Sequence, residues 1–95
     1  MRIIGVDPGN VLSGYVVLHH GKVDESGVVA NGWLLNWLKD AVPSHYRLAI
    51  EFTQARGMPA SNQLFETILW TGRFIQAWPD PNSAILLDSP IDSVY

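Results

Sequence analysis

Short apolar runs open the chain and predict strands. The runs cover residues 3–7 and 14–18, rich in the Val, Ile and Tyr that strands prefer, and a hairpin turn then leads into a third, more polar strand at 23–29. Turn-forming residues at 8–10 and 20–22 separate the runs. The spacing therefore predicts three antiparallel strands joined by short turns.

Two stretches with helical spacing follow, with a further apolar run between them. Asn31 can cap a helix over residues 32–39, where apolar side chains recur on one face. The run at 47–51 predicts a buried fourth strand, and helical spacing then extends from residue 61 to about residue 78. A last apolar run at 84–88 predicts a fifth strand.

The predicted order of elements is βββαβαβ, which indicates an α/β fold built on one mixed five-stranded sheet with flanking helices. The first three strands would be antiparallel, and the later strands would enter through helical crossovers. In a chain of 95 residues this makes one domain, which we expect to cover residues 1–88. Residues 89–95 have little pattern of their own and are expected to form an unstructured tail.

The composition excludes several classes of protein. The chain has no Cys, which rules out a disulfide framework and a thiolate zinc site. No apolar stretch approaches the ~18 residues of a membrane span, and the N-terminus lacks a signal-peptide cleavage site, so we expect a cytoplasmic protein. The net charge of -3, with only six Lys and Arg, argues against DNA binding by this chain unaided.

Two carboxylates, Asp7 and Glu51, are the main candidates for chemistry. Each ends a buried-strand pattern, and ligands in open α/β sheets gather at the carboxyl ends of strands. If the two strands are neighbours, the carboxylates meet at one edge and favour a cation such as Mg²⁺ between them. The simpler interpretation, in which Asp7 caps the following turn and Glu51 pairs with a surface cation, stays open on these residues alone.

A family resemblance supports the metal interpretation. The sequence DPGxxxSGY, which begins at Asp7, resembles the opening of the RuvC-like Holliday-junction resolvases of the RNase H-like superfamily, in which Thr stands in place of Ser13. The sequence LAIE, which ends at Glu51, resembles the fourth strand of that family. Residues 65–74 are similar to the following helix of phage and prophage relatives, so the resemblance covers nearly all of residues 1–78.

The resemblance implies an RNase H-like fold and a crossover junction endodeoxyribonuclease. It implies that Asp7 and Glu51 are catalytic, bind Mg²⁺ or Mn²⁺, and help to activate the attacking water. It also implies a homodimer that nicks opposed strands of a four-way DNA junction. The family completes its site with one or two acids on a helix after the fifth strand. We find no such helix in the sequence, so we expect a chain truncated at its C-terminus, with Asp88 and Asp92 as the remaining candidate ligands.

Three residues are candidates for contact with DNA. Gly9 can take a positive φ and bring the backbone close to a bound ion or phosphate, and Asn10 follows it in the same turn. Arg56 follows Glu51 on a loop, where it could contact a phosphate.

Two other functions remain open. One is a non-catalytic binding or dimerisation module of RNase H-like fold, in which Asp7 and Glu51 are relics. The other is a nucleotide-binding domain of the actin and sugar-kinase type, which also opens with a strand, an Asp and a Gly-containing hairpin. Binding of a divalent metal distinguishes the nuclease from the non-catalytic module. Binding of ATP would indicate the nucleotide-binding domain.

Overall fold

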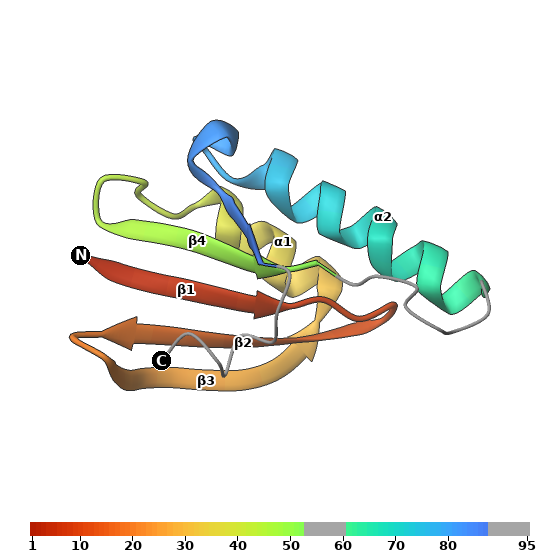
Figure 1. Ribbon diagram of the computed structural model, residues 1–95, viewed down its shortest axis with the longest axis horizontal. Helices are drawn as coiled ribbons and strands as arrows, with labels where there is room; N and C mark the ends of the chain where they lie inside the picture. Colours follow the sequence, from red (N-terminus) through yellow and green to blue (C-terminus); the bar gives the residue numbers. More distant parts are fainter. Residues whose placement is uncertain (53–60, 88–95) are drawn as a thin grey trace.

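The computed structural model describes residues 1–52 and 61–87, which form a five-stranded sheet and two helices (Figure 1). The strands are β1 (Arg2–Asp7), β2 (Leu12–His19), β3 (Lys22–Ala30), β4 (Tyr46–Glu51) and β5 (Ile85–Leu87). The helices are α1 (Asn31–Lys39) and α2 (Asn62–Ala77), and a short 3-10 helix, η1 (Pro81–Ser83), precedes β5. The α/β fold predicted from the sequence is confirmed, with its elements in the predicted order.

The sheet has the strand order β3-β2-β1-β4-β5. The first three strands form an antiparallel meander, whereas β1 pairs with β4, and β4 with β5, in parallel. Short turns suffice for the antiparallel connections, and the helices provide the crossovers that parallel pairing requires. Consequently the carboxyl ends of β1, β4 and β5 lie at one edge of the sheet, as the arrowheads of β1 and β4 in Figure 1 show for these two strands.

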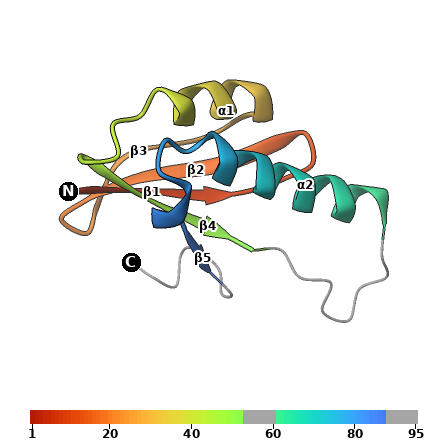
Figure 2. The same cartoon turned by 90° about the horizontal axis from the view of Figure 1, so that it is seen from above.

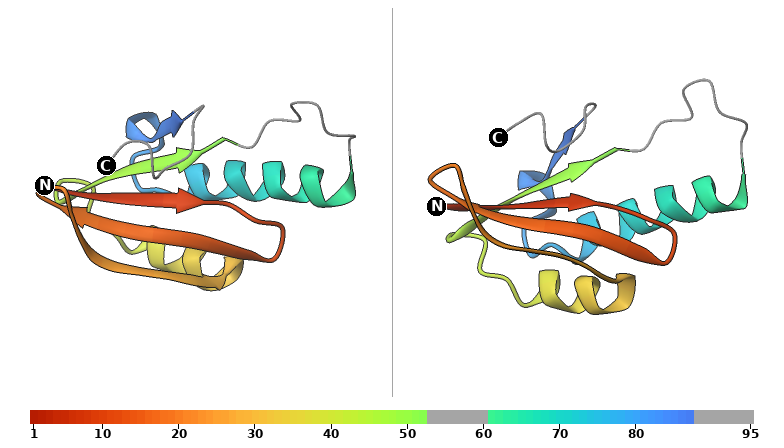
Figure 3. Two further views of the ribbon diagram at one scale, coloured as in Figure 1. Left: turned by 60° about the horizontal axis from the view of Figure 1, so that its bottom comes forward. Right: turned by 90° about the horizontal axis from the view of Figure 1, so that it is seen from below.

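The apolar core lies between the sheet and both helices, which cover the same face (Figure 2). Side chains alternate between the two faces of a strand, so every second residue of β1 and β4 points into this core. The buried core residues are Ile4, Val6, Val17, Leu34, Leu38, Leu48, Ile50, Phe74 and Trp78. Among the described residues, the opposite face of the sheet carries no helix (Figure 3).

The two helices begin in different ways. Ser61 caps α2, because its side chain accepts a hydrogen bond from the Leu64 amide at 3.1 Å. The prediction that Asn31 caps α1 was wrong, because Ala30 is the cap residue and makes no side-chain capping bond. The side chain of Asn31 is buried and instead bonds to the turn after β1. Within the described part of the chain, no helix is long and apolar enough to cross a membrane.

Candidate metal site

Asp7 and Glu51 end two neighbouring parallel strands. The register of β1 and β4 places Val6 opposite Ile50, and the two acids are the next residue on each strand. Neighbouring strands are separated by only about 4.8 Å, which one cation can bridge. The condition on which the sequence interpretation depended, that these strands are neighbours, is therefore met.

The two acids also belong to the same face of the sheet. Val6 and Ile50 are each 0% exposed and point into the core beneath the helices. Since successive side chains of a strand alternate, Asp7 and Glu51 project from the helix-free face. Asp7 is exposed and Glu51 is half-buried, so a ligand can approach the two carboxylates from solvent on the side of Asp7.

Small and apolar neighbours flank the two carboxylates. Gly14 of β2 lies opposite Asp7, and a Cβ placed on it would lie 3.8 Å from the Asp7 Cβ, so the glycine leaves space beside the acid. On the other side Leu87 of β5 lies opposite Glu51, and its carbonyl accepts a hydrogen bond from the Phe52 amide at 2.9 Å. The two acids thus form the centre of a row of four residues, one from each of four strands: Gly14, Asp7, Glu51 and Leu87. The β2 end of this row carries no side chain, because it is a glycine.

The turn after Asp7 depends on Gly9, for a reason that the sequence did not predict. A Cβ on Gly9 would lie 2.1 Å from the backbone oxygen of Leu12, a distance that no side chain can occupy. The expected positive φ of Gly9 was wrong, because positive values within residues 1–52 and 61–87 occur only at His20 (53°) and Gly21 (74°). Gly9 is required by close packing of the turn rather than by its dihedral angle.

A closed ring of hydrogen bonds holds Gly9. Its amide donates to Ser13 Oγ at 3.1 Å, and its carbonyl accepts from Asn31 Nδ2 at 2.9 Å. The Ser13 hydroxyl donates to Asn31 Oδ1 at 2.5 Å, which closes the ring. Ser13 and Asn31 are only 1% and 2% exposed. Sequence reasoning included Ser13 in the motif but missed Asn31, since no local pattern shows which distant group a buried amide contacts.

The donor chemistry of the two acids suits a hard divalent cation. Carboxylate oxygens are the ligands that Mg²⁺ and Mn²⁺ prefer, and Mg²⁺ commonly uses one or two carboxylates and keeps several waters. Within the described ranges 1–52 and 61–87, no cluster of three or more His, Asp or Glu side chains converges on one point. The other candidate ligands, Asp88 and Asp92, and the candidate phosphate contact Arg56 lie outside the described residues.

Comparison with known proteins bears on this arrangement. No family model and no curated protein sequence matches the chain. Among solved structures, T. thermophilus RuvC in complex with Holliday junction substrate is similar over 92% of this chain, with a TM-score of 0.65 and 17% sequence identity. A second structure of Thermus thermophilus RuvC gives a TM-score of 0.65 and 18% identity over the same share of this chain. The fold is the RNase H-like fold of RuvC.

The likeness to RuvC has two bounds. At 17% and 18% identity it establishes the fold and leaves the activity of this chain to be proposed. The chain also spans less than two thirds of each RuvC chain, 64% of one and 63% of the other. The RuvC-like fold predicted from the sequence motif is nonetheless confirmed.

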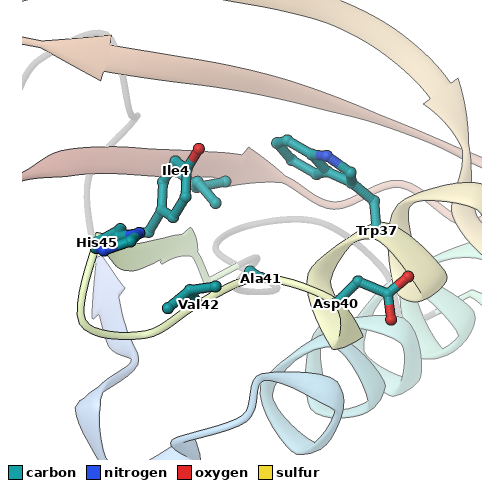
Figure 4. A pocket seen from close by; sticks show the side chains of 7 residues that line it. Ile4, Trp37, Asp40, Ala41, Val42 and His45 are labelled. Atoms are coloured by element: carbon teal, nitrogen blue, oxygen red, sulfur yellow. The ribbon is translucent and has the colours of Figure 1, made fainter.

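A cavity of about 410 Å³ lies at the other end of this RuvC-like sheet (Figure 4). Tyr46, which lines it, pairs with Arg2 at the amino ends of β4 and β1. Figure 4 places Asp40 and His45 on opposite sides of the cavity, with Trp37 above it. The cavity therefore offers no paired carboxylates and is separate from the row that contains Asp7.

Two titratable side chains of β2 have shifted pKa values. The hydrogen bond from Tyr15 Oη to Glu25 at 2.8 Å raises the pKa of Tyr15 above 10.0. Desolvation, together with the charge of the neighbouring His20, lowers the pKa of His19. Tyr15 packs on Trp37 of α1, with ring centroids 5.2 Å apart, and His19 ends β2 at the far edge of the RuvC-like sheet. Neither group belongs to the row around Asp7.

Proposed function

We propose that this chain carries part of the catalytic site of a divalent-metal-dependent endodeoxyribonuclease that hydrolyses phosphodiesters at four-way DNA junctions. The observation that carries the proposal is the parallel register of β1 and β4, which puts Asp7 and Glu51 at one edge and on one face. The fold shared with T. thermophilus RuvC, solved in complex with a Holliday junction substrate, supports it. The same pair of acids on a fold unlike that of RuvC would support a nuclease less strongly.

The roles of the two acids follow from their exposure. Glu51 and Asp7 would hold Mg²⁺ or Mn²⁺ through their carboxylate oxygens, Glu51 from a half-buried position and Asp7 from an exposed one. When bound, such an ion polarises the phosphodiester and lowers the pKa of a coordinated water. Asp7, the more exposed of the two acids, would therefore face the scissile phosphate.

A third acid would complete the site. Asp88 is the first residue after β5, a strand whose carboxyl end lies at the same edge as those of β1 and β4, whereas Asp92 comes four residues later in the sequence. We therefore place Asp88 ahead of Asp92 as the further ligand. Asp88→Asn should reduce metal-dependent cleavage, whereas Asp92→Asn should leave it near the wild-type rate; the reverse order would contradict this assignment.

Contacts to DNA would come from the turn after Asp7 and from the segment after Glu51. The amide of Gly9 is occupied by Ser13, so Gly9 would contribute only a close backbone approach, and Asn10 would donate from its side chain. Arg56 would contact a phosphate. Because the net charge is -3, we expect binding by the chain alone to be weak and strongly weakened by salt.

A homodimer would form through the outer face of α2. Phe65 is 59% exposed and Leu69 53% exposed, at helical spacing with Ile68, which is 37% exposed. Gly72 continues this face, and a Cβ there would meet nothing within 4 Å. In an antiparallel two-fold pairing of α2 with a second copy, Phe65 would lie over Gly72 of that copy.

The charges of α2 agree with such a pairing. In the pairing that places Phe65 over Gly72, Glu66 of one copy lies within about two residues of Arg73 of the other, so opposite charges would approach each other. Light scattering should give the mass of a dimer for the wild type and of a monomer for Phe65→Glu. Val28→Glu, at a 70% exposed position on β3, is the matched control and should remain dimeric. A dimer that survives Phe65→Glu would contradict this interface.

The test of the proposed activity is cleavage of a labelled four-way DNA junction with Mg²⁺ and with Mn²⁺, beside a linear duplex of the same sequence. We expect symmetric nicks in the junction that require the metal and disappear in Asp7→Asn. A folded wild-type protein that leaves the junction intact would contradict the nuclease. It would favour a binding or dimerisation module of the same fold, for which the exposed apolar face of α2 is the supporting observation.

A further inference from the structure

We propose that Ser13 and Asn31 are positioning residues for Asp7, which they orient by clamping Gly9, two residues further along the chain. The consequence for metal binding rests on the proposed function, whereas the effect on the conformation of Asp7 does not. Both side chains are almost fully buried, so the role that we propose for them is indirect and involves no contact with a metal or with DNA.

The first argument is the completeness of the clamp. Gly9 has one backbone donor and one backbone acceptor, and both are bound by side chains: the amide by Ser13 and the carbonyl by Asn31. The bond from Ser13 to Asn31 orients both side chains at once. Among the described residues, no buried side-chain nitrogen or oxygen atom lacks a partner, so each polar side-chain atom of this ring is bonded. A satisfied buried polar network rigidifies what it holds.

The second argument is the position of Asp7 between two fixed points. On its amino-terminal side, the antiparallel ladder fixes β1, with Asp7 opposite Gly14. On its carboxyl-terminal side comes the buried Pro8, whose ring fixes φ, and then the clamped Gly9. With both sides held, the backbone of Asp7 is restricted, and so is the direction in which its side chain leaves the strand. Releasing Gly9 would free one of the two sides.

The third argument is that the clamp connects the turn to the core. Asn31 is the first residue of α1, and its backbone amide donates to the Val11 carbonyl at 3.0 Å. The same helix places Leu34 and Leu38 in the core, each 0% exposed. The turn after Asp7 is thus anchored to a helix that cannot shift without disturbing the core.

The test compares four variants with the wild type. Ser13→Ala removes both bonds of the hydroxyl, and Ser13→Cys keeps the volume with a weak donor in case the first variant does not fold. Ser13→Thr keeps the hydroxyl and is the residue that the resembling family carries here. Thr71→Ala is the matched control, since Thr71 is 3% exposed and its hydroxyl donates to the Thr67 carbonyl of the same helix, outside the ring around Gly9.

Two readouts separate positioning from stability. The first is the dissociation constant for Mn²⁺ alone, measured by calorimetry under conditions where every variant is fully folded. The second is metal-free NMR of the Asp7 side-chain carboxyl and hydrogen exchange of the Gly9 amide. We expect Ser13→Ala to weaken Mn²⁺ binding by roughly 10- to 100-fold, the range for residues that orient a metal ligand. It should also give multiple Asp7 resonances, with Ser13→Cys intermediate and Ser13→Thr and Thr71→Ala close to wild type.

The outcomes distinguish the two proposals. If the wild type does not bind Mn²⁺, the metal site fails, and the Asp7 resonances alone decide whether Ser13 positions that residue. If the wild type binds Mn²⁺ but Ser13→Ala binds equally well and keeps a single Asp7 conformation, the positioning role is wrong. An equal loss of Mn²⁺ affinity in Thr71→Ala would also overturn it, because the effect would then follow stability.

Discussion

The two ends of β1 and β4 differ in shape and in chemistry. At the amino end, a cavity of about 410 Å³ lies between the sheet and the end of α1, lined largely by apolar and aromatic side chains. At the carboxyl end, Asp7 and Glu51 stand side by side on the open face of the sheet. A concave pocket is the usual first candidate for a binding site, yet here the pair of acids lies elsewhere.

Strand direction explains why the acids, rather than the cavity, mark the candidate site. In parallel strands the carboxyl ends collect at one edge, so acids that end two adjacent strands must meet there. The cavity at the other edge lies where the chain enters these strands, and Asp40 and His45 lie on opposite sides of it. The following predictions set the two ends against each other.

The largest difference should appear when acids are neutralised. Asp7→Asn and Glu51→Gln should each lower the rate of junction cleavage by more than about 100-fold, since each removes a direct metal ligand rather than a supporting group. Asp40→Asn at the cavity should leave the rate unchanged. Single-turnover cleavage with Mg²⁺ measures the rate of all three variants. A comparable loss of rate in Asp40→Asn would contradict a catalytic site at the carboxyl ends of β1 and β4.

The glycines of the two ends should behave differently when replaced. Gly9→Ala should lower the free energy of unfolding by about 1–3 kcal/mol, the cost of overpacking, and should also abolish cleavage. Gly21→Ala, in the hairpin at the amino end, should cost about 1–2 kcal/mol because its φ is 74°, but should keep the activity. Denaturant unfolding and cleavage of the folded fraction measure both effects. Equal losses of activity would mean that stability alone controls the rate.

The pH dependence of stability should report on the amino end through His19. Its folded-state pKa is lowered below the ordinary value of 6.5, so protonation favours the unfolded chain. The contribution of His19 is therefore complete above pH 6.5 and is lost as the pH falls through the folded-state value. Wild type should lose more stability than His19→Gln over this range in denaturant titrations. Identical pH profiles would contradict the assignment to His19.

The smallest effect should come from filling the cavity. Ala41→Leu adds volume to a half-buried position in its wall and should change the free energy of unfolding by less than about 1.5 kcal/mol. Cleavage and Mn²⁺ affinity should stay at the wild-type level. Loss of either one in a variant that remains folded would connect the cavity to the candidate metal site.

The strands and their order along the chain were predictable, because the sequence patterns that indicate them are local. Apolar runs that end in Asp7 and Glu51, separated by turn residues and a helix, indicated both the strands and the edge at which the acids end. The RuvC-like fold followed from the same residues and is supported by the solved RuvC structures. What the sequence predicted was the order of elements and the ends of the strands.

The details of the turn after Asp7 were not predictable, because they depend on contacts between distant residues. Asn31 looked like a helix cap, but its side chain bonds to Gly9, 22 residues earlier. Gly9 looked like a residue with positive φ, but the backbone oxygen of Leu12 is what excludes a side chain there. Periodicity describes which face a residue occupies and does not describe which polar group it meets on that face.

Paramagnetic broadening by Mn²⁺ tests the central claim most directly. The two ends of β1 are separated by roughly 17 Å, so a bound Mn²⁺ ion should broaden NMR signals at one end far more than at the other. We predict that substoichiometric Mn²⁺ broadens the amide signals of Asp7, Gly14 and Leu87 and leaves those of residues 40–46 sharp, and that Asp7→Asn removes the effect. Broadening centred on residues 40–46, or unchanged in Asp7→Asn, would contradict a metal site formed by Asp7 and Glu51.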